Sequence, residues 1–118
     1  MRRDDYDACV AAHYLARHQL TAAARLEWNV IAARHAEAVQ DGRADDFFPS
    51  LYLNLADAYA GVGRLNEAHA MVAQARATLP NIVAGGYRAM IEMGIERLVS
   101  RIDAAPAAPA ALAAPAAP

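Results

Sequence analysis

The chain has 118 residues, of which 57% are hydrophobic, and its formal net charge is −2. This composition suffices for one domain with an apolar core, although alanine supplies much of the apolar content and buries little area per residue. The charge leaves no basic footprint for nucleic acid or an anionic membrane, and the lack of lysine excludes a phosphate-loop lysine and a lysine nucleophile.

Cysteine usage and the first residues predict a soluble, cytoplasmic protein. Cys9 is the single cysteine, so no intramolecular disulfide can form, which fits a reducing compartment. Two arginines stand near the start, but acidic residues follow them where a signal peptide has an apolar run. No stretch approaches the roughly 20 apolar residues of a membrane span.

Glycine and proline divide the chain into segments with apolar residues at helical spacing, and strand signals are almost absent. Helices are predicted over residues 4–17, 21–40, 46–60, 66–79 and 87–102. Thr21 and Asn66 suit the N-caps of the second and fourth helices, and Pro49 is tolerated in the first turn of the third. The sequence therefore predicts an all-α fold.

Apolar stripes indicate the faces of the helices that pack together. The first helix has a short stripe, formed by Tyr6, Val10 and Tyr14. The second continues through Leu26, Trp28, Val30 and Ile31. The stripe of the fifth helix consists of Tyr87, Met90, Ile91, Gly94, Ile95, Leu98 and Ile102. In contrast, residues 104–118 contain only alanine, proline and one leucine, which predicts a disordered or polyproline-like tail.

An internal similarity relates the first two helices to the next two. A shift of about 45 residues places Val10 on Leu55, Tyr14 on Tyr59 and Thr21 on Asn66. Small residues recur within the helices, and we expect Ala56 to face Ala68 where two helices cross closely.

Residues 49–80 resemble a tetratricopeptide repeat. The signature positions are filled by Tyr52, Leu55, Ala56, Tyr59, Gly63, Ala68, Val72, Ala75 and Pro80. Residues 4–40 resemble a degenerate copy, with His18 where glycine is usual and Glu27 where an aromatic residue is expected. The extra residues between the copies exceed the family's period of about 34.

The resemblance implies antiparallel helix-turn-helix repeats in a tetratricopeptide-like α-solenoid. The helical domain would cover residues 1–103, with repeats at about 4–40 and 47–80 and a C-terminal capping helix at about 84–103. Two repeats fall short of the three or more that usually give a stable stack. The sequence leaves three sources for the missing packing: self-association, a partner protein, or further repeats of a longer array.

No catalytic, cofactor or metal motif is found. His13 and His18 are five residues apart, on different helix faces, and HExxH, CxxC and GxSxG patterns are absent. Gly61 and Gly63 are interpreted as an interhelix turn, since they follow a helix and not a strand. Asp45 and Asp46 are interpreted as a helix start above two packed phenylalanines, Trp28 as a core residue, and Cys9 as a small buried hydrophobe.

The family resemblance also implies a concave groove, lined by the first helix of each repeat, that holds extended peptides. The matching positions in the second repeat are Leu53, Asn54, Asp57 and Gly61, with Asn54 placed to hold a peptide backbone or carboxylate. Cys9 takes the place of Asn54 in the degenerate copy. Tyr87 and Arg88 follow if the capping helix continues the register. A full carboxylate clamp needs several basic residues, so that clamp is not expected, and Asn54 is equally explained as a scaffold residue.

The sequence thus predicts a non-catalytic module that binds a peptide or partner protein, without cofactors, nucleic acid or membrane. A homo-oligomeric assembly role is the first alternative. A small-molecule-binding, regulatory or enzymatic site in the groove is the second.

Deletion of residues 104–118 tests the boundary of the helical domain. A segment that buries no core surface contributes little, so the free energy of unfolding should change by less than about 0.5 kcal/mol. Thermal unfolding followed by circular dichroism measures this. A large fall in Tm would contradict the predicted boundary.

Overall fold

The computed structural model describes residues 4–104, which form five α-helices and two short 3-10 helices and contain no strand. The α-helices are α1 (Asp5–Ala16), α2 (Ala22–Ala38), α3 (Phe48–Gly61), α4 (Leu65–Thr78) and α5 (Gly86–Ala104). The 3-10 helix η1 (Asp45–Phe47) leads into α3, and η2 (Leu79–Asn81) follows α4. The all-α prediction is confirmed. The predicted tail lies outside the described residues, except for Ala104 at the end of α5.

The helix N-termini confirm one predicted cap and correct another. The Thr21 hydroxyl accepts a hydrogen bond from the backbone N–H of Ala24 at 3.1 Å, so Thr21 caps α2 as expected. Asn66 is not a cap, because α4 begins at Leu65 and Asn66 lies in its first turn. Gly63 adopts a positive φ of 82°, and the N–H of Arg64 bonds to the carbonyl of Tyr59 at 2.9 Å. This tight turn lets α4 begin earlier than the sequence suggested.

The helix starts repeat at an interval of 43 residues, from Asp5 to Phe48 and from Ala22 to Leu65. The predicted shift of about 45 is therefore wrong by two residues. The buried positions of the second helices follow the observed interval, since Asn29, Ala32 and Ala36 correspond to Val72, Ala75 and Leu79. The alignment of residue types failed because it matched exposed side chains of the first copy with packed ones of the second.

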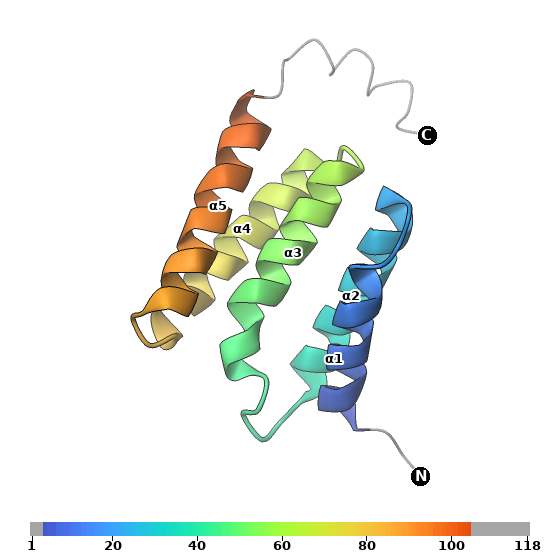
Figure 1. Cartoon of the computed structure of the whole chain (residues 1–118), viewed down its shortest axis with the longest axis vertical. Coiled ribbons are helices and arrows are strands. Elements are labelled where there is room, and N and C mark those ends of the chain that lie inside the picture. The colour runs from blue at the N-terminus through green and yellow to red at the C-terminus, as the bar shows by residue number, and fades with distance from the viewer. Residues whose placement is uncertain (1–3, 105–118) are drawn as a thin grey trace.

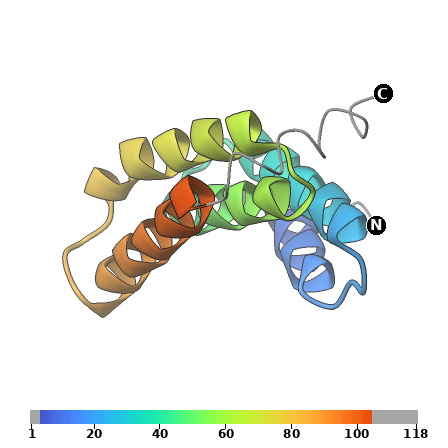
Figure 2. The ribbon, with the colours of Figure 1, turned by 90° about the horizontal axis from the view of Figure 1, so that it is seen from above.

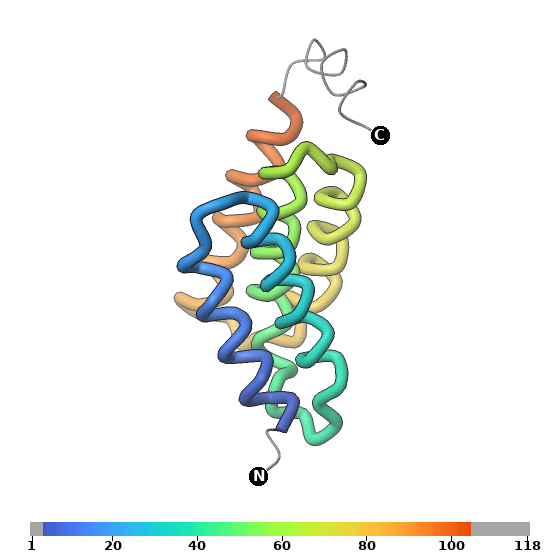
Figure 3. The backbone as a smooth tube through the Cα atoms, turned by 90° about the vertical axis from the view of Figure 1, so that its right-hand side faces the viewer, coloured from blue at the N-terminus to red at the C-terminus, as the bar shows by residue number. Residues whose placement is uncertain are grey.

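The helices form two hairpins and a final helix. Figure 3 shows α1 and α2 running antiparallel through a turn at one end, and α3 and α4 form the second hairpin. α2 packs on α3, while α5 packs on both α3 and α4. The molecule bends, with α1, α3 and α5 on the inner side of the bend and α2 and α4 on the outer side (Figures 1 and 2).

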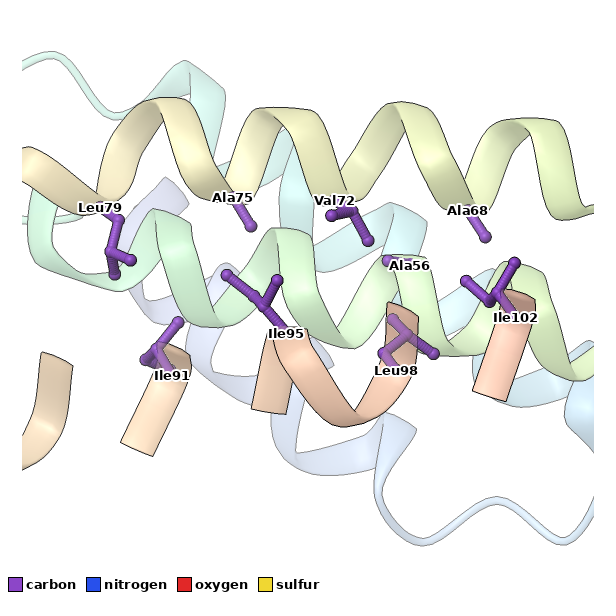
Figure 4. Packing of buried hydrophobic residues seen from close by; sticks show 9 residues of the cluster. All are labelled: Ala56, Ala68, Val72, Ala75, Leu79, Ile91, Ile95, Leu98 and Ile102. Atoms are coloured by element: carbon purple, nitrogen blue, oxygen red, sulfur yellow. The ribbon is translucent and has the colours of Figure 1, made fainter. Parts of the chain in front are cut away.

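One cluster of buried residues joins α3, α4 and α5. It contains Ala56, Ala68, Val72, Ala75, Leu79, Ile91, Ile95, Leu98 and Ile102 (Figure 4). Ala56 and Ala68 are both 0% exposed, and Figure 4 shows both between α3 and α4, on the side where α5 packs. The complete burial of both methyl groups in one cluster agrees with the predicted close crossing, because side chains this small let two helix backbones approach.

A second cluster joins α1 and α2 to the start of α3. It contains Cys9, Ala12, Ala32, Ala36, Ala44 and Leu51, with Trp28, Phe47 and Phe48 among the side chains packed against it. Cys9 is thus a core residue, as the sequence indicated, whereas Trp28 is only partly buried and packs against the core. Burial raises the pKa of the Cys9 thiol to about 11, which keeps it protonated and unreactive near neutral pH.

Two predicted apolar stripes are only partly buried. Val10 and Tyr14 on α1 are 42% and 61% exposed, and the buried face of that helix consists of Cys9, Ala12 and Ala16. The larger side chains point outward because α1 packs mainly on α2, through small residues. On α5, Tyr87 and Met90 are likewise exposed, whereas the predicted isoleucines and Leu98 are buried.

Replacement of Ala68 by leucine tests the close crossing. The added methylenes have no space between α3 and α4, so Ala68→Leu should lower the free energy of unfolding by roughly 1–3 kcal/mol. Ala73 lies on the exposed side of α4, and Ala73→Leu should be nearly neutral. Urea unfolding of both variants measures the difference, and equal tolerance at the two positions would contradict this packing.

Candidate functional site

Two adjacent hollows flank α3 and share Asn54, Asp57 and Arg101. The first has a volume of about 340 Å³, lies between α3 and the α1–α2 hairpin, and is lined by Ala16, Arg17, Ala22, Arg25, Asn29, Asn54, Asp57, Ala58, Gly61 and Arg101. The second has a volume of about 470 Å³, lies between α3 and α5, and is lined by Leu53, Asn54, Asp57, Gly94, Arg97, Leu98 and Arg101. We call the two together the α3 groove.

Four residues that the sequence assigned to a groove line the α3 groove, namely Leu53, Asn54, Asp57 and Gly61. They lie on α3 at helical spacing, so one face of this helix carries them. Cys9 does not join them, because it is fully buried in the second cluster. Its predicted equivalence to Asn54 depended on the shift of about 45 residues. The observed starts of the helices correct this shift to 43 residues.

Tyr87 and Arg88 do not line the α3 groove either. The Tyr87 hydroxyl donates to the carbonyl of Asp46 at 3.1 Å, and Arg88 donates to the carbonyl of Ile82 at 3.3 Å. Both therefore lie near the beginning of α3 and α5. The predicted register assumed the family's period of about 34 residues, whereas the observed contacts pair Leu53 with Gly94 and Asp57 with Arg101.

Four arginines that the sequence reasoning missed converge on the α3 groove. Arg17 and Arg25 line its first hollow, Arg97 lines the second, and Arg101 lines both. Asp57 is the one carboxylate among the lining residues, and it accepts a hydrogen bond from Arg101. The groove is thus positively charged on a chain whose formal net charge is −2. The only available signal was that Arg97 and Arg101 are four residues apart on one helix face.

Asn54 and Asn29 give the groove two side-chain amides. The Nδ2 of Asn54 lies 3.5 Å from the Nδ1 of His13, whose ring packs edge-on against Phe47 with 5.0 Å between centroids. Burial, and then the nearby charge of Arg17, lower the pKa of His13 below its usual 6.5. The lowered pKa favours the neutral ring, which can accept a hydrogen bond from Asn54 at Nδ1 in the tautomer that carries its proton on Nε2. Asn29 is buried and donates to the carbonyl of Arg25 at 2.9 Å.

Gly94 brings α5 close to α3 beside the second hollow. A Cβ atom at this position would lie 2.7 Å from Cδ2 of Leu53, which is closer than two carbon atoms approach without a shift. The absence of a side chain therefore leaves room for Leu53 and opens the space that Arg97 and Arg101 flank.

Other types of site find little support in residues 4–104. Within this range no three His, Cys, Asp or Glu side chains are grouped to hold a metal ion. Asp45 and Asp46 form part of η1, which agrees with their interpretation as a helix start. None of the helices in the described part of the chain has the length and apolar character of a membrane span.

Comparison of the chain with protein-family models, with curated proteins and with solved structures found no match. The tetratricopeptide resemblance therefore rests on the residues of the chain itself.

The lowered pKa of His13 predicts a pH dependence of stability. Because the unfolded chain binds a proton at this residue with a pKa near 6.5 and the folded chain binds it less readily, stability should fall as the pH drops below about 6.5. Above that pH, His13 is neutral in both the folded and the unfolded chain, and its protonation no longer lowers the free energy of unfolding. His13→Gln removes this part of the pH dependence. A single proton can change the free energy of unfolding by at most about 1.4 kcal/mol per pH unit, and solvent screening makes the change smaller at a half-buried site.

Urea unfolding of wild type and His13→Gln at about pH 7.5 and about pH 5.5 measures the effect. The other histidines contribute equally to both proteins, so the difference isolates His13. An identical loss of stability in the two proteins would contradict the lowered pKa.

Proposed function

We propose that the chain is a tetratricopeptide-type interaction module that binds an extended segment of a partner protein in the α3 groove, without catalysis. The observation that carries this proposal is the position of the groove along α3, between the α1–α2 hairpin and α5. α1, α3 and α5 lie on the inner side of the bend (Figure 2). Curved helical repeats use this inner surface for extended ligands. Both helices of the second hairpin begin 43 residues after their counterparts in the first hairpin, which supports the repeat interpretation.

The chemistry of the groove suits a polypeptide backbone. An extended peptide exposes N–H and C=O groups that need partners, and the side-chain amides of Asn29 and Asn54 both donate and accept. Leu53 and Leu98 add apolar surface in the second hollow. Asp57, the one carboxylate in the lining, is paired with Arg101, which does not suit a free general base.

Assembly of two or more copies is a second candidate function. Met90 and Met93 on α5 are 60% and 55% exposed, and Val83 before the helix is exposed as well. In a longer array, another helix would cover this side of α5. The molar mass of the purified protein, measured by light scattering, separates the two candidates, because a clean monomer argues against assembly.

A selection from a random peptide library tests the binding function without assuming the composition of the ligand. Peptides enriched on wild type should bind Asn54→Ala about twofold to tenfold more weakly, because a hydrogen bond to a neutral backbone group contributes about 0.5–1.5 kcal/mol. Affinities are measured by titration, and circular dichroism verifies that the variant folds.

Two variants serve as controls for the selection. Asn66→Ala removes the same side chain from an exposed position on α4, and Arg88→Ala removes an arginine outside the groove. Both should bind the enriched peptides like wild type. Equal binding to Asn54→Ala, or a loss at Asn66, would show that the groove is not the site.

A further inference from the structure

The arginines of the α3 groove differ from most other arginines of the described chain in their ionic partners. Outside the groove, Arg43, Arg64, Arg76 and Arg88 each form an ion pair with an Asp or Glu. Within the groove, Arg17, Arg25 and Arg97 form none with residues 4–104. Their charges therefore stay available around the α3 groove, where Arg25, on the outer helix α2, also donates to the carbonyl of Gln19 at 3.4 Å. Arg34, on the exposed side of α2, is likewise without such a pair and serves below as a control.

The fourth groove arginine, Arg101, is held by Asp57. The contact joins the guanidinium to one carboxylate oxygen, and both side chains are largely exposed to solvent. An exposed pair of this kind contributes little to stability, since water and salt screen it. A carboxylate of a ligand can therefore replace Asp57 at Arg101 at small cost. Asp57 occupies the place in which such a ligand group would bind.

We infer that the ligand of the α3 groove is an acidic peptide segment whose side-chain carboxylates bind the groove arginines, and that Asp57 competes with it for Arg101. This inference rests on the proposed binding function and specifies its ligand. Guanidinium groups bind carboxylates through paired, charge-assisted hydrogen bonds, so arginine favours this class of ligand over neutral peptides.

The placement of the arginines indicates how long the segment is. Arg17 and Arg25 belong to the α1–α2 side of the groove and Arg97 and Arg101 to α5, so α3 lies between the two pairs. Two interhelix spacings of about 10 Å give at most roughly 20 Å between the sides, and less for Arg101, which also lines the first hollow. An extended chain covers this distance in about six residues. The segment then carries carboxylates toward both ends, and its backbone crosses α3 at Asn54.

A nucleic acid fits the groove less well than an acidic peptide. The residues that line the α3 groove include no aromatic ring on which a base could stack. The formal net charge of −2 also opposes a long polyanion, whereas a short acidic segment engages only the local arginines.

Fluorescence-polarisation titration of the full chain with defined probes tests this inference. The first probe is a labelled peptide of five glutamate–serine repeats with an amidated C-terminus, so that only side-chain carboxylates carry charge. Matched probes are the glutamine–serine peptide and a short oligothymidylate. The glutamate peptide should bind at least about tenfold more tightly than either matched probe, with an affinity that falls as salt is added.

Variants of the groove separate specific binding from general attraction. Arg25→Gln and Arg101→Gln should each weaken binding of the glutamate peptide by about tenfold. Arg34→Gln removes the same charge outside the groove and should leave the affinity unchanged. Asp57→Asn should strengthen binding severalfold, because it frees Arg101 and removes a like charge from the ligand's path. A gain in affinity also demonstrates that this variant is folded.

The inference is overturned if Arg34→Gln and the groove variants lose equal affinity, if Asp57→Asn weakens binding, or if oligothymidylate binds as well as the glutamate peptide. Selected peptides that are neutral but still depend on Asn54 would leave the proposed function intact and refute the acidic ligand alone.

Discussion

The close approach of α3 and α4 at Ala56 and Ala68 is the constraint on which the rest of the structure depends. Because both side chains are single methyl groups without exposed area, the two helices can cross with their backbones near each other. α5 then fits against both helices, and its buried aliphatic residues complete one core cluster (Figure 4). A larger residue at either alanine would find no free space between the helices and would strain this packing.

This packing leaves one face of α3 free and fixes its surroundings. Leu51 anchors the beginning of α3 in the second cluster, and Ala56 anchors its middle in the first. The face that carries Asn54 and Asp57 therefore points into the space between the α1–α2 hairpin and α5. Side chains placed on a helix packed on two sides are held more rigidly than those on a loop, which favours their use in recognition.

The sequence predicted local features and missed those that depend on how distant helices pack. Periodicity and glycine positions located all five helices, and the small residues of the second hairpin indicated the Ala56–Ala68 crossing. The repeat register failed because Tyr14 resembles Tyr59 in type, although Tyr14 is exposed and Tyr59 packs against the core. Asn54 and Asp57, which the sequence assigned to one face of a single helix, line the α3 groove.

The groove arginines could not be found in the same way. They come from segments far apart in the sequence, between Arg17 and Arg101. Only the packing of α5 beside α3 brings Arg101 to Asp57. No spacing rule connects Arg17 to Arg97. The predicted register of α5, taken from a shorter repeat, selected Tyr87 and Arg88 instead, and these lie near the opposite end of that helix.

The most direct test of the α3 groove as a binding site uses the four asparagines of the chain as reporters. Asn29 and Asn54 line the groove, whereas Asn66 and Asn81 lie on and after α4. Nuclear magnetic resonance of their side-chain amide groups, recorded while a bound peptide is titrated in, reports contact at each position. The account predicts that the signals of Asn29 and Asn54 shift in proportion to occupancy and that those of Asn66 and Asn81 do not. Shifts confined to Asn66 and Asn81 would contradict it.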